Sequence, residues 1–259
     1  MYDLHSHILP GVDDGPERME DSVEMARVAV EQGTRIILAT PHRADVTKKH
    51  SVSHIQALVE QLNGKLQSEG IALRVELGME NHLDLNLPDD LERGRALRMS
   101  ESRYALIELP FFGYPNYVEE VLFRVQVQGI VPVLAHPERL EVFQERRDLL
   151  FDFIERGMLS QVTAGSVVGL FGGSTKRVTH RMIRDGLVHI IASDTHYPHG
   201  PRSPLITAGL EATARIVGKE LAEAMVVDTP KAILDDRPIQ LQPPHRVDGA
   251  RRWWRFWEA

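Results

Sequence analysis

The sequence contains no cysteine among its 259 residues. This absence excludes a disulfide framework, a zinc site built on thiolates and an iron–sulfur cluster held by cysteine. It also excludes a cysteine nucleophile, and with it the thiol-based phosphatases and proteases. Any enzymatic activity of this chain must therefore work without a thiol.

Long hydrophobic runs are missing as well. No apolar stretch reaches the ~20 residues that a membrane-spanning helix needs, and the opening residues lack the basic and apolar regions of a signal peptide. Acidic residues outnumber basic ones, 37 to 30, which argues against a general nucleic-acid-binding protein. We expect a cytoplasmic protein with no nucleic-acid partner. A local basic pocket for a phosphorylated substrate is compatible with this charge.

Short aliphatic runs recur at intervals of about 30 residues, the length that a strand–helix–strand unit of parallel strands requires. Segments between them, such as 19–32 and 53–69, place apolar residues at helical spacing. This pattern predicts an α/β fold, a closed or nearly closed barrel of seven strands. We expect one domain over residues 1–250, followed by an Arg/Trp-rich tail at 251–259. The strand centres are Leu4, Leu38, Leu77, Ile107, Leu134, Val162 and Ile191.

Histidines and carboxylates follow six of these seven predicted strands. One histidine at a strand end is more often a capping or solvated residue, but chance is a poor explanation for six ends. The C-terminal strand ends of such a barrel meet at one face, which holds the active site. We therefore expect these residues to converge, with the other seven histidines as background. The set is His5, His7, Asp13 or Asp14, His42, Glu80, Glu108, His136, Asp194 and His196.

This many carboxylates and imidazoles would be hard to hold together without cations. The set exceeds one tetrahedral site and suits two or three metal ions that share bridging carboxylates. Ligands without sulfur favour Mn²⁺, Zn²⁺ or Fe over Cu(I). Such centres activate water and stabilise the oxygens of an in-line displacement, most often in the hydrolysis of a phosphate ester.

Three arginines stand near the predicted ligands. Arg139 follows His136 by three residues, and Arg202 lies in a proline-rich loop after His196. Guanidinium groups bind phosphate oxygens in a bidentate way, so we assign both a catalytic and substrate-binding role. Arg43 is a third candidate for substrate binding, and a salt bridge is its alternative role.

Four phrases of the sequence resemble those of the PHP (polymerase and histidinol phosphatase) superfamily. Within it the chain is most similar to the bacterial CpsB/CapC-type tyrosine-protein phosphatases of capsule and exopolysaccharide clusters, from Tyr2 to about Leu234. The resemblance implies a distorted (β/α)7 barrel with a trinuclear metal site, commonly assigned to Mn²⁺ or Fe. It also implies dephosphorylation of the tyrosine-rich C-terminal tail of a membrane-associated bacterial tyrosine autokinase. The phrases are Asp3–His7, Val12–Pro16, Ser102–Glu108 and Ile191–His196.

The resemblance also implies how the ligands are shared, and it favours Asp14 over Asp13. Arg139 and Arg202 match the phosphate-binding arginines of the family, although the second arginine of the family pattern stands one residue nearer the last histidine. The implied metal sets are Glu80, Glu108 and His136; His5, His7, Glu80 and Asp194; and Asp14, His42 and His196.

The mechanism that these residues predict is in-line attack of a metal-bound hydroxide on phosphorus, without a covalent phosphoenzyme. In the loop Phe111–Tyr117, Phe112 and Tyr114 would flank the phosphotyrosine ring, or the loop would pack on the barrel rim. The alternative function is another PHP phosphoesterase acting on histidinol phosphate or a nucleotide. An amidohydrolase and a scaffold with structural metals fit the residues less well.

The tail interleaves three arginines with four aromatic residues at positions 251–257. Such a segment could make a weak contact with a membrane interface, which would place the protein at the inner face of the membrane. Binding a partner or packing on the barrel are equally good interpretations of so short a segment.

Overall fold

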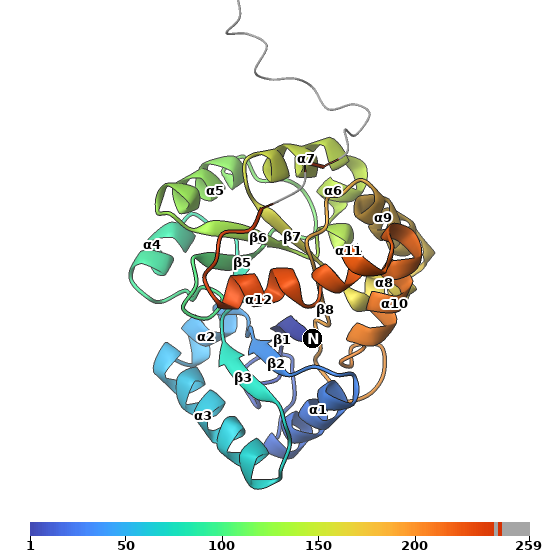
Figure 1. The fold of residues 1–259 in the computed structure, drawn as a ribbon. Helices are drawn as coiled ribbons and strands as arrows, with labels where there is room; N and C mark the ends of the chain where they lie inside the picture. The colour runs from blue at the N-terminus through green and yellow to red at the C-terminus, as the bar shows by residue number, and fades with distance from the viewer. Residues whose placement is uncertain (241–242, 245–259) are drawn as a thin grey trace, which may run out of the picture.

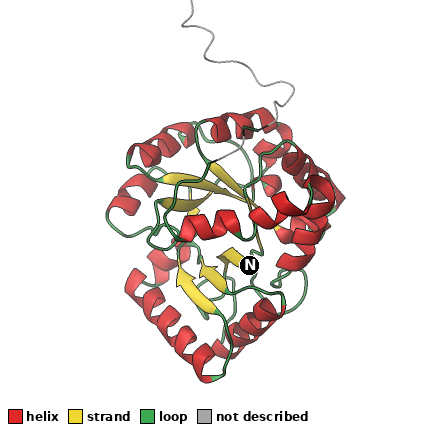
Figure 2. Ribbon diagram, viewed as in Figure 1, coloured by secondary structure: helices red, strands yellow, loops and turns green. Residues whose placement is uncertain are grey.

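The computed structural model describes residues 1–240 and 243–244, so the tail at 251–259 lies outside the described residues. Parallel strands form two sheets, drawn in yellow in Figure 2. Their strand orders are β1-β2-β3 and β4-β5-β6-β7-β8. Every predicted strand is present, and β4 is an additional strand of two residues. The strands are β1 (Tyr2–Ser6), β2 (Ile36–Ala39), β3 (Arg74–Leu77), β4 (Asn81–His82), β5 (Tyr104–Glu108), β6 (Val131–Ala135), β7 (Leu159–Thr163) and β8 (Ile190–Ala192).

The two sheets are joined at both edges. At one edge the His7 N–H donates to the Thr195 carbonyl at 2.8 Å, and the Asp194 N–H donates to the His5 carbonyl at 2.9 Å, which links β1 to the segment after β8. At the other edge the chain runs directly from β3 to β4 through residues 78–80. The predicted α/β class is therefore confirmed, and the barrel is distorted where its third strand divides into β3 and β4.

Helices surround the strands (Figure 1). The two helices predicted over 19–32 and 53–69 are confirmed within one residue at each end. None of the described helices is long and apolar enough to span a membrane. The helices are α1 (Met19–Glu31), α2 (Arg43–Lys49), α3 (Val52–Ser68), α4 (Leu87–Glu92), α5 (Val118–Val127), the 3₁₀ turn η1 (Pro137–Arg139), α6 (Glu141–Glu145), α7 (Arg147–Glu155), α8 (Ala164–Val168), α9 (Gly173–Arg184), α10 (Ile206–Val217), α11 (Lys219–Ala224) and α12 (Asp228–Leu234).

Apolar residues form an outer layer and an inner plug. Two clusters lie between strands and helices, one against α1 and α3 and the other against the helices from α4 to α10. A third cluster lies inside the barrel and is built by the first residues of several strands, including Tyr104, Leu159 and Ile190. Ile233 of α12 completes it. Because this plug fills the N-terminal end of the barrel, the polar interior is confined to the C-terminal strand ends.

An irregularity in β1 directs its side chains into that polar end. Asp3 pairs with Ile37 and Ser6 with Ala39, so three steps along β1 match two along β2. Bulges of this kind re-aim side chains beside active sites. Leu4 consequently belongs to the interior plug while the next residue, His5, also faces the interior.

His189 lies buried before β8, where its Nδ1 accepts the Ser160 N–H at 3.1 Å. Burial lowers the pKa of His189 to about 4. The unfolded chain binds this proton below about pH 6.5, whereas the folded chain binds it only below about pH 4. Between those values the unfolded state holds more protons, so stability falls as the pH falls.

We therefore expect His189 to remove on the order of 3 kcal/mol from the free energy of unfolding between pH 6.5 and pH 4. A His189→Asn variant keeps an acceptor for Ser160 but cannot be protonated. Urea unfolding across this pH range should show a shallower pH dependence for the variant than for the wild type. Identical pH dependence in the two proteins would contradict the assignment.

Candidate metal centre

Nine polar side chains meet at the C-terminal ends of the strands. They come from β1, the first βα loop, the segments after β2, β3, β6 and β8, and the end of β5. The structure brings together every residue of the predicted ligand set, and most of them are buried. These residues, here called the His/carboxylate cluster, are His5, His7, Asp14, His42, Glu80, Glu108, His136, Asp194 and His196.

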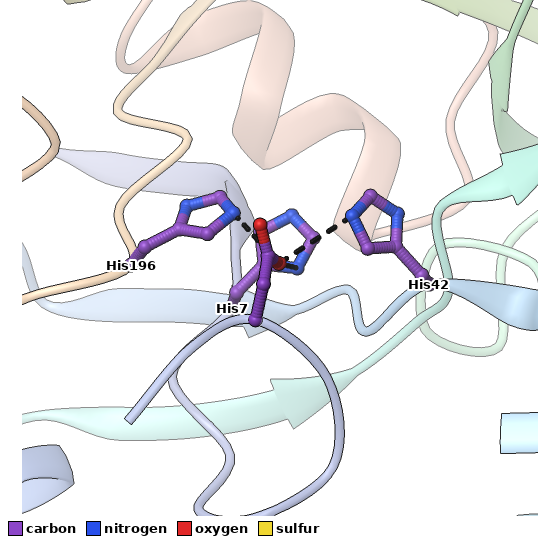
Figure 3. A group of neighbouring side chains, drawn as sticks. His7, His42 and His196 are labelled. Atoms are coloured by element: carbon purple, nitrogen blue, oxygen red, sulfur yellow. Dashed lines mark ion pairs between the residues drawn. The ribbon is translucent and has the colours of Figure 1, made fainter. Parts of the chain in front are cut away.

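Asp14 lies at the centre of the first group within the cluster. Its Oδ1 is 3.1 Å from His196 Nε2, 3.5 Å from His42 Nε2 and 3.8 Å from His7 Nδ1. The three rings point toward one another from three separate segments (Figure 3). Asp14, rather than Asp13, therefore occupies the position of a candidate ligand.

Glu80 lies at the centre of the other groups and is only 1% exposed. Its Oε1 is 2.9 Å from His136 Nε2 and 3.3 Å from His5 Nε2. Its Oε2 is 2.9 Å from His42 Nδ1 and 3.4 Å from His7 Nε2. One carboxylate that faces four imidazoles has the arrangement of a bridging ligand.

Asp194 and Glu108 extend the cluster on two sides. Asp194 Oδ1 lies 3.6 Å from the Nε2 atoms of His5 and His7. Glu108 Oε1 lies 3.5 Å from His136 Nε2. Glu108 also lies in one group of neighbouring ligand atoms with His42 and Glu80, so it is near both His42 and His136.

Two cluster residues have left-handed backbone conformations, with φ of 32° at His136 and 52° at Asp194. Residues other than glycine seldom adopt this region, and such strain is concentrated at functional sites. Asp194 is held in place because its own N–H donates to the His5 carbonyl and the preceding Ser193 N–H donates to Asp3 Oδ1 at 2.9 Å. Asp3 is fully buried, and burial raises its pKa to about 6.

Sequence reasoning missed the residues that orient the histidines. Asp13 Oδ2 lies 2.7 Å from His7 Nδ1 and also accepts the His42 N–H at 3.0 Å. Gln161 Oε1 lies 2.9 Å from His5 Nδ1. Outer partners of this kind fix the tautomer and the ring orientation of metal-ligating histidines. The second aspartate of the Asp13–Asp14 pair was a signal for such a partner, whereas nothing in the sequence marks Gln161.

The buried carboxylates of the cluster need positive charge beside them. Burial disfavours protonation of His7 and His42, yet the facing carboxylates outweigh burial and raise their pKa values to about 10 and about 11. Burial likewise opposes ionisation of Glu80, but the surrounding histidines hold its pKa well below the usual range. Burial and the Glu80 charge together raise the pKa of Glu108. Protons on imidazole thus balance the carboxylates, and divalent cations could replace them.

Arg139 and Arg202 both reach the cluster. Arg139 Nη1 lies 2.5 Å from Asp194 Oδ2, and Arg202 Nη2 lies 3.4 Å from Asp194 Oδ1. Arg202 Nη1 is also 3.4 Å from Asp14 Oδ2. The two guanidinium groups therefore meet at Asp194, as two groups that bind one phosphoryl oxyanion would.

The structure corrects the expectation for Arg43. Its side chain is 3% exposed, ion-paired with Asp90, and 2.7 Å from Asp84 Oδ2. It also donates to the His82 carbonyl at 3.0 Å. Because these partners occupy its guanidinium group, Arg43 forms a buried ion-pair network rather than a substrate contact.

The aromatic residues of the loop after β5 differ in their exposure. Phe112 is 82% exposed, so its contact with a substrate stays a prediction. Tyr114 is half-buried against the apolar cluster that packs on the helices from α4 to α10, which favours packing on the rim. This burial raises the pKa of Tyr114 to about 12. The ring nearest the cluster belongs to Phe111, which stacks on His136 at 5.6 Å.

The chain is similar in sequence to several proteins that are named tyrosine-protein phosphatases. The tyrosine-protein phosphatase YwqE of Bacillus subtilis (strain 168) is 37% identical over 247 residues, which are 95% of this chain and 96% of that protein. The tyrosine-protein phosphatase CpsB of Streptococcus pneumoniae is 29% identical over 248 residues, 92% of this chain and 100% of that protein.

A crystal structure from work on YwqE and CpsB, described as unique metal-dependent tyrosine phosphatases, matches this fold with a TM-score of 0.91. The match has 37% sequence identity and covers 95% of this chain and 99% of that chain. In addition, residues 1–235 match the family described as capsular polysaccharide synthesis, CpsB/CapC. The resemblance noted from the sequence is thereby confirmed, and the chain belongs to the CpsB/CapC family.

Proposed function

We propose that this protein is a metal-dependent phosphatase that hydrolyses phosphotyrosine, the activity for which its relatives YwqE and CpsB are named. One observation carries the proposal: a buried carboxylate, Glu80, faces four imidazoles, and two arginines border the same cluster. This arrangement combines a polynuclear metal site with cations for a phosphoryl group. It needs no cysteine, and the chain has none.

The His/carboxylate cluster fits two or three divalent ions, for which we propose Mn²⁺ first, with Fe or Zn²⁺ as alternatives. Its donor set contains only imidazole nitrogens and carboxylate oxygens. The buried Nε2 of His196 has no hydrogen-bond partner among the described residues, although Asp14 Oδ1 is 3.1 Å away. When bound, such ions lower the pKa of water and stabilise the oxygens of an in-line displacement. The proposed sets are Glu80, Glu108 and His136; His5, His7, Glu80 and Asp194; and Asp14, His42 and His196.

In three histidines Nδ1 has a partner outside the metal sets, so Nε2 is the atom available to bind a metal ion. His7 holds a proton on Nδ1 toward Asp13, and His5 holds one toward Gln161. His196 Nδ1 donates to the Asp194 carbonyl at 2.9 Å. With Nδ1 as the donor in each ring, Nε2 faces the cluster and would bind the metal ion once it has lost any proton that it carries.

Arg139 and Arg202 bind the phosphoryl oxygens and neutralise the charge that develops on them. Their present contacts with Asp194 place both groups at one edge of the cluster. A phenolate is a comparatively good leaving group, so this site needs no strong general acid. Phe112, exposed on the loop after β5, is proposed to contact the aromatic ring of the substrate.

The proposed substrate is a phosphotyrosine protein, namely the C-terminal tail of a membrane-associated bacterial tyrosine kinase in capsule or exopolysaccharide synthesis. The family description, capsular polysaccharide synthesis, supports the link to capsule synthesis, and the kinase tail is the part that we propose from the resemblance. We further propose that residues 1–250 act as one domain in the cytoplasm, at the inner face of the membrane.

The Mn²⁺-loaded protein should hydrolyse phosphotyrosine peptides and lose this activity in excess chelator. His136→Ala should reduce turnover strongly because the mutation removes an imidazole next to Glu80 and Glu108. Turnover of histidinol phosphate and of a nucleotide, measured in parallel, tests the alternative PHP activities. Full activity in chelator or in His136→Ala would refute the proposal.

Metal binding should release protons. At pH 7.5 the metal-free protein holds His7 and His42 protonated, because their pKa values of about 10 and about 11 lie above this pH. Ligands must lose these protons, so affinity should rise with pH over the neutral range. Calorimetric Mn²⁺ titrations in buffers of different ionisation enthalpy measure the release. His42→Gln should reduce the number of protons released, whereas the exposed control His199→Gln should not change that number. Binding enthalpies that do not depend on the buffer would contradict the assignment.

Replacement of either arginine should weaken catalysis. Arg139→Ala and Arg202→Ala are each expected to lower kcat/KM by about 10²–10³-fold, as the loss of one oxyanion-stabilising group does. Lysine at either position should restore only part of the activity, because an ammonium group cannot bind two oxygens in the same plane. Arg181→Ala, on the exposed face of α9, is the matched control. A wild-type value of kcat/KM in Arg139→Ala and Arg202→Ala would remove the arginines from the mechanism.

A further inference from the structure

Of the seven strands expected from the sequence, β7 is the one whose C-terminal end carries none of the nine cluster residues. We propose that the segment after it contributes a positioning residue instead: Phe171, acting with Phe111, holds the Arg139 guanidinium group in the orientation that binds the phosphoryl group. This inference rests on the proposed function, in which Arg139 contacts phosphate.

The guanidinium group of Arg139 lies over two aromatic rings. Arg139 Cζ lies 4.9 Å from the centre of the Phe171 ring and 5.3 Å from the centre of the Phe111 ring. Both distances are within the range of cation–π attraction. Asp194 is the third contact, at 2.5 Å from Arg139 Nη1. Two aromatic faces and a carboxylate therefore define the plane and the direction of the guanidinium group.

Phe111 also connects the arginine with the His/carboxylate cluster. Its ring stacks on His136 with an interplanar angle of 22°. His136 in turn lies 2.9 Å from Glu80. Through Phe111, the position of Arg139 is coupled to a ring of the candidate metal centre.

The backbone after β7 brings Phe171 next to Arg139 at the C-terminal end of the barrel. α8 ends at Val168 and is capped by Gly169, which has φ of 99°, and Gly172 has φ of 93°, so a glycine with positive φ stands on each side of Phe171. The ring then packs over Gly165. A Cβ at Gly165 would lie 2.9 Å from Phe171 Cε2, closer than carbon atoms normally approach. Gly165 thus leaves the space that the ring occupies beside Arg139.

An arginine without such contacts would sample many rotamers and lose that freedom on binding. A guanidinium group held against two rings is already ordered, so less entropy is lost when phosphate binds. Partial desolvation by the rings also strengthens its interaction with an anion. The effect of Phe171 should therefore be seen in phosphate affinity rather than in metal content.

The test uses inorganic phosphate as the probe and Mn²⁺-loaded full-length protein. Phe171→Leu should weaken phosphate binding, measured by calorimetry, by about three- to tenfold, and raise KM for a phosphotyrosine peptide similarly. Phe171→Tyr retains an aromatic face and should stay within about twofold of the wild type. Gly165→Ala, which displaces the ring without removing it, should weaken phosphate binding as Phe171→Leu does. Phe123→Leu, on the exposed face of α5, is the control.

The coupling to Arg139 is tested by a double-mutant cycle. In an Arg139→Ala background, Phe171→Leu should have no further effect on phosphate affinity, because the cation that it positions is absent. Metal content and the unfolding temperature, measured on every variant, separate positioning from folding. Unchanged phosphate affinity in both Phe171→Leu and Gly165→Ala, or additive losses in the cycle, would overturn the proposal. Failure of the proposed function would instead appear as a wild type that binds phosphate but does not hydrolyse phosphotyrosine.

Discussion

The interaction on which the rest of the site depends is the burial of the Glu80 carboxylate against four imidazoles. An ion this deeply buried is costly unless opposite charge surrounds it. The imidazoles provide that charge as protons, and metal ions would provide it as divalent cations. The backbone of Glu80 is equally constrained, because its N–H donates to the Pro41 carbonyl and its carbonyl accepts the Arg43 N–H. One residue therefore joins the electrostatics of the cluster to the pairing of the strands.

Glu80 lies where the barrel is distorted. The chain leaves β3, passes through residues 78–80 and enters β4, which belongs to the other sheet. The Arg43 network with Asp84 and Asp90 ties the same region to α4. A buried ion-pair network is weak evidence for stability by itself, but here it links segments that share no sheet. The distortion and the bridging carboxylate thus belong to one local arrangement.

Different strand ends contribute different kinds of residue to the site. Those that carry histidine or carboxylate form the cluster, whereas β7 contributes Gln161 beneath His5 and leads into Phe171 beside Arg139. Asp13 bonds to Nδ1 of His7 and orients that ring, just as Gln161 orients the ring of His5. Partners of this kind are usual for metal-ligating histidines, and they come from a distant strand for His5 but from nearby residues for His7 and His196.

The sequence by itself determined the fold class and the identity of the cluster, because both depend on spacing. Strands at intervals of about 30 residues predict the parallel α/β arrangement, and parallel strands bring their C-terminal ends to one face. His5, Glu108 and Asp194 could therefore be assigned to one site without any knowledge of their contacts.

Only the tertiary structure decided which histidine atoms Asp13 and Asp14 each contact, that Arg43 is buried in ion pairs, and that Phe171 lies against Arg139. Asp13 and Asp14 are adjacent, so their roles differ only in the direction of their side chains. Arg43 finds its partners 41 and 47 residues away, and nothing in local spacing encodes such a contact. The positive φ angles at Gly169 and Gly172 are local, because glycine permits them, whereas the contacts of Arg43 and of Phe171 join segments that are distant in the sequence and form only when those segments pack.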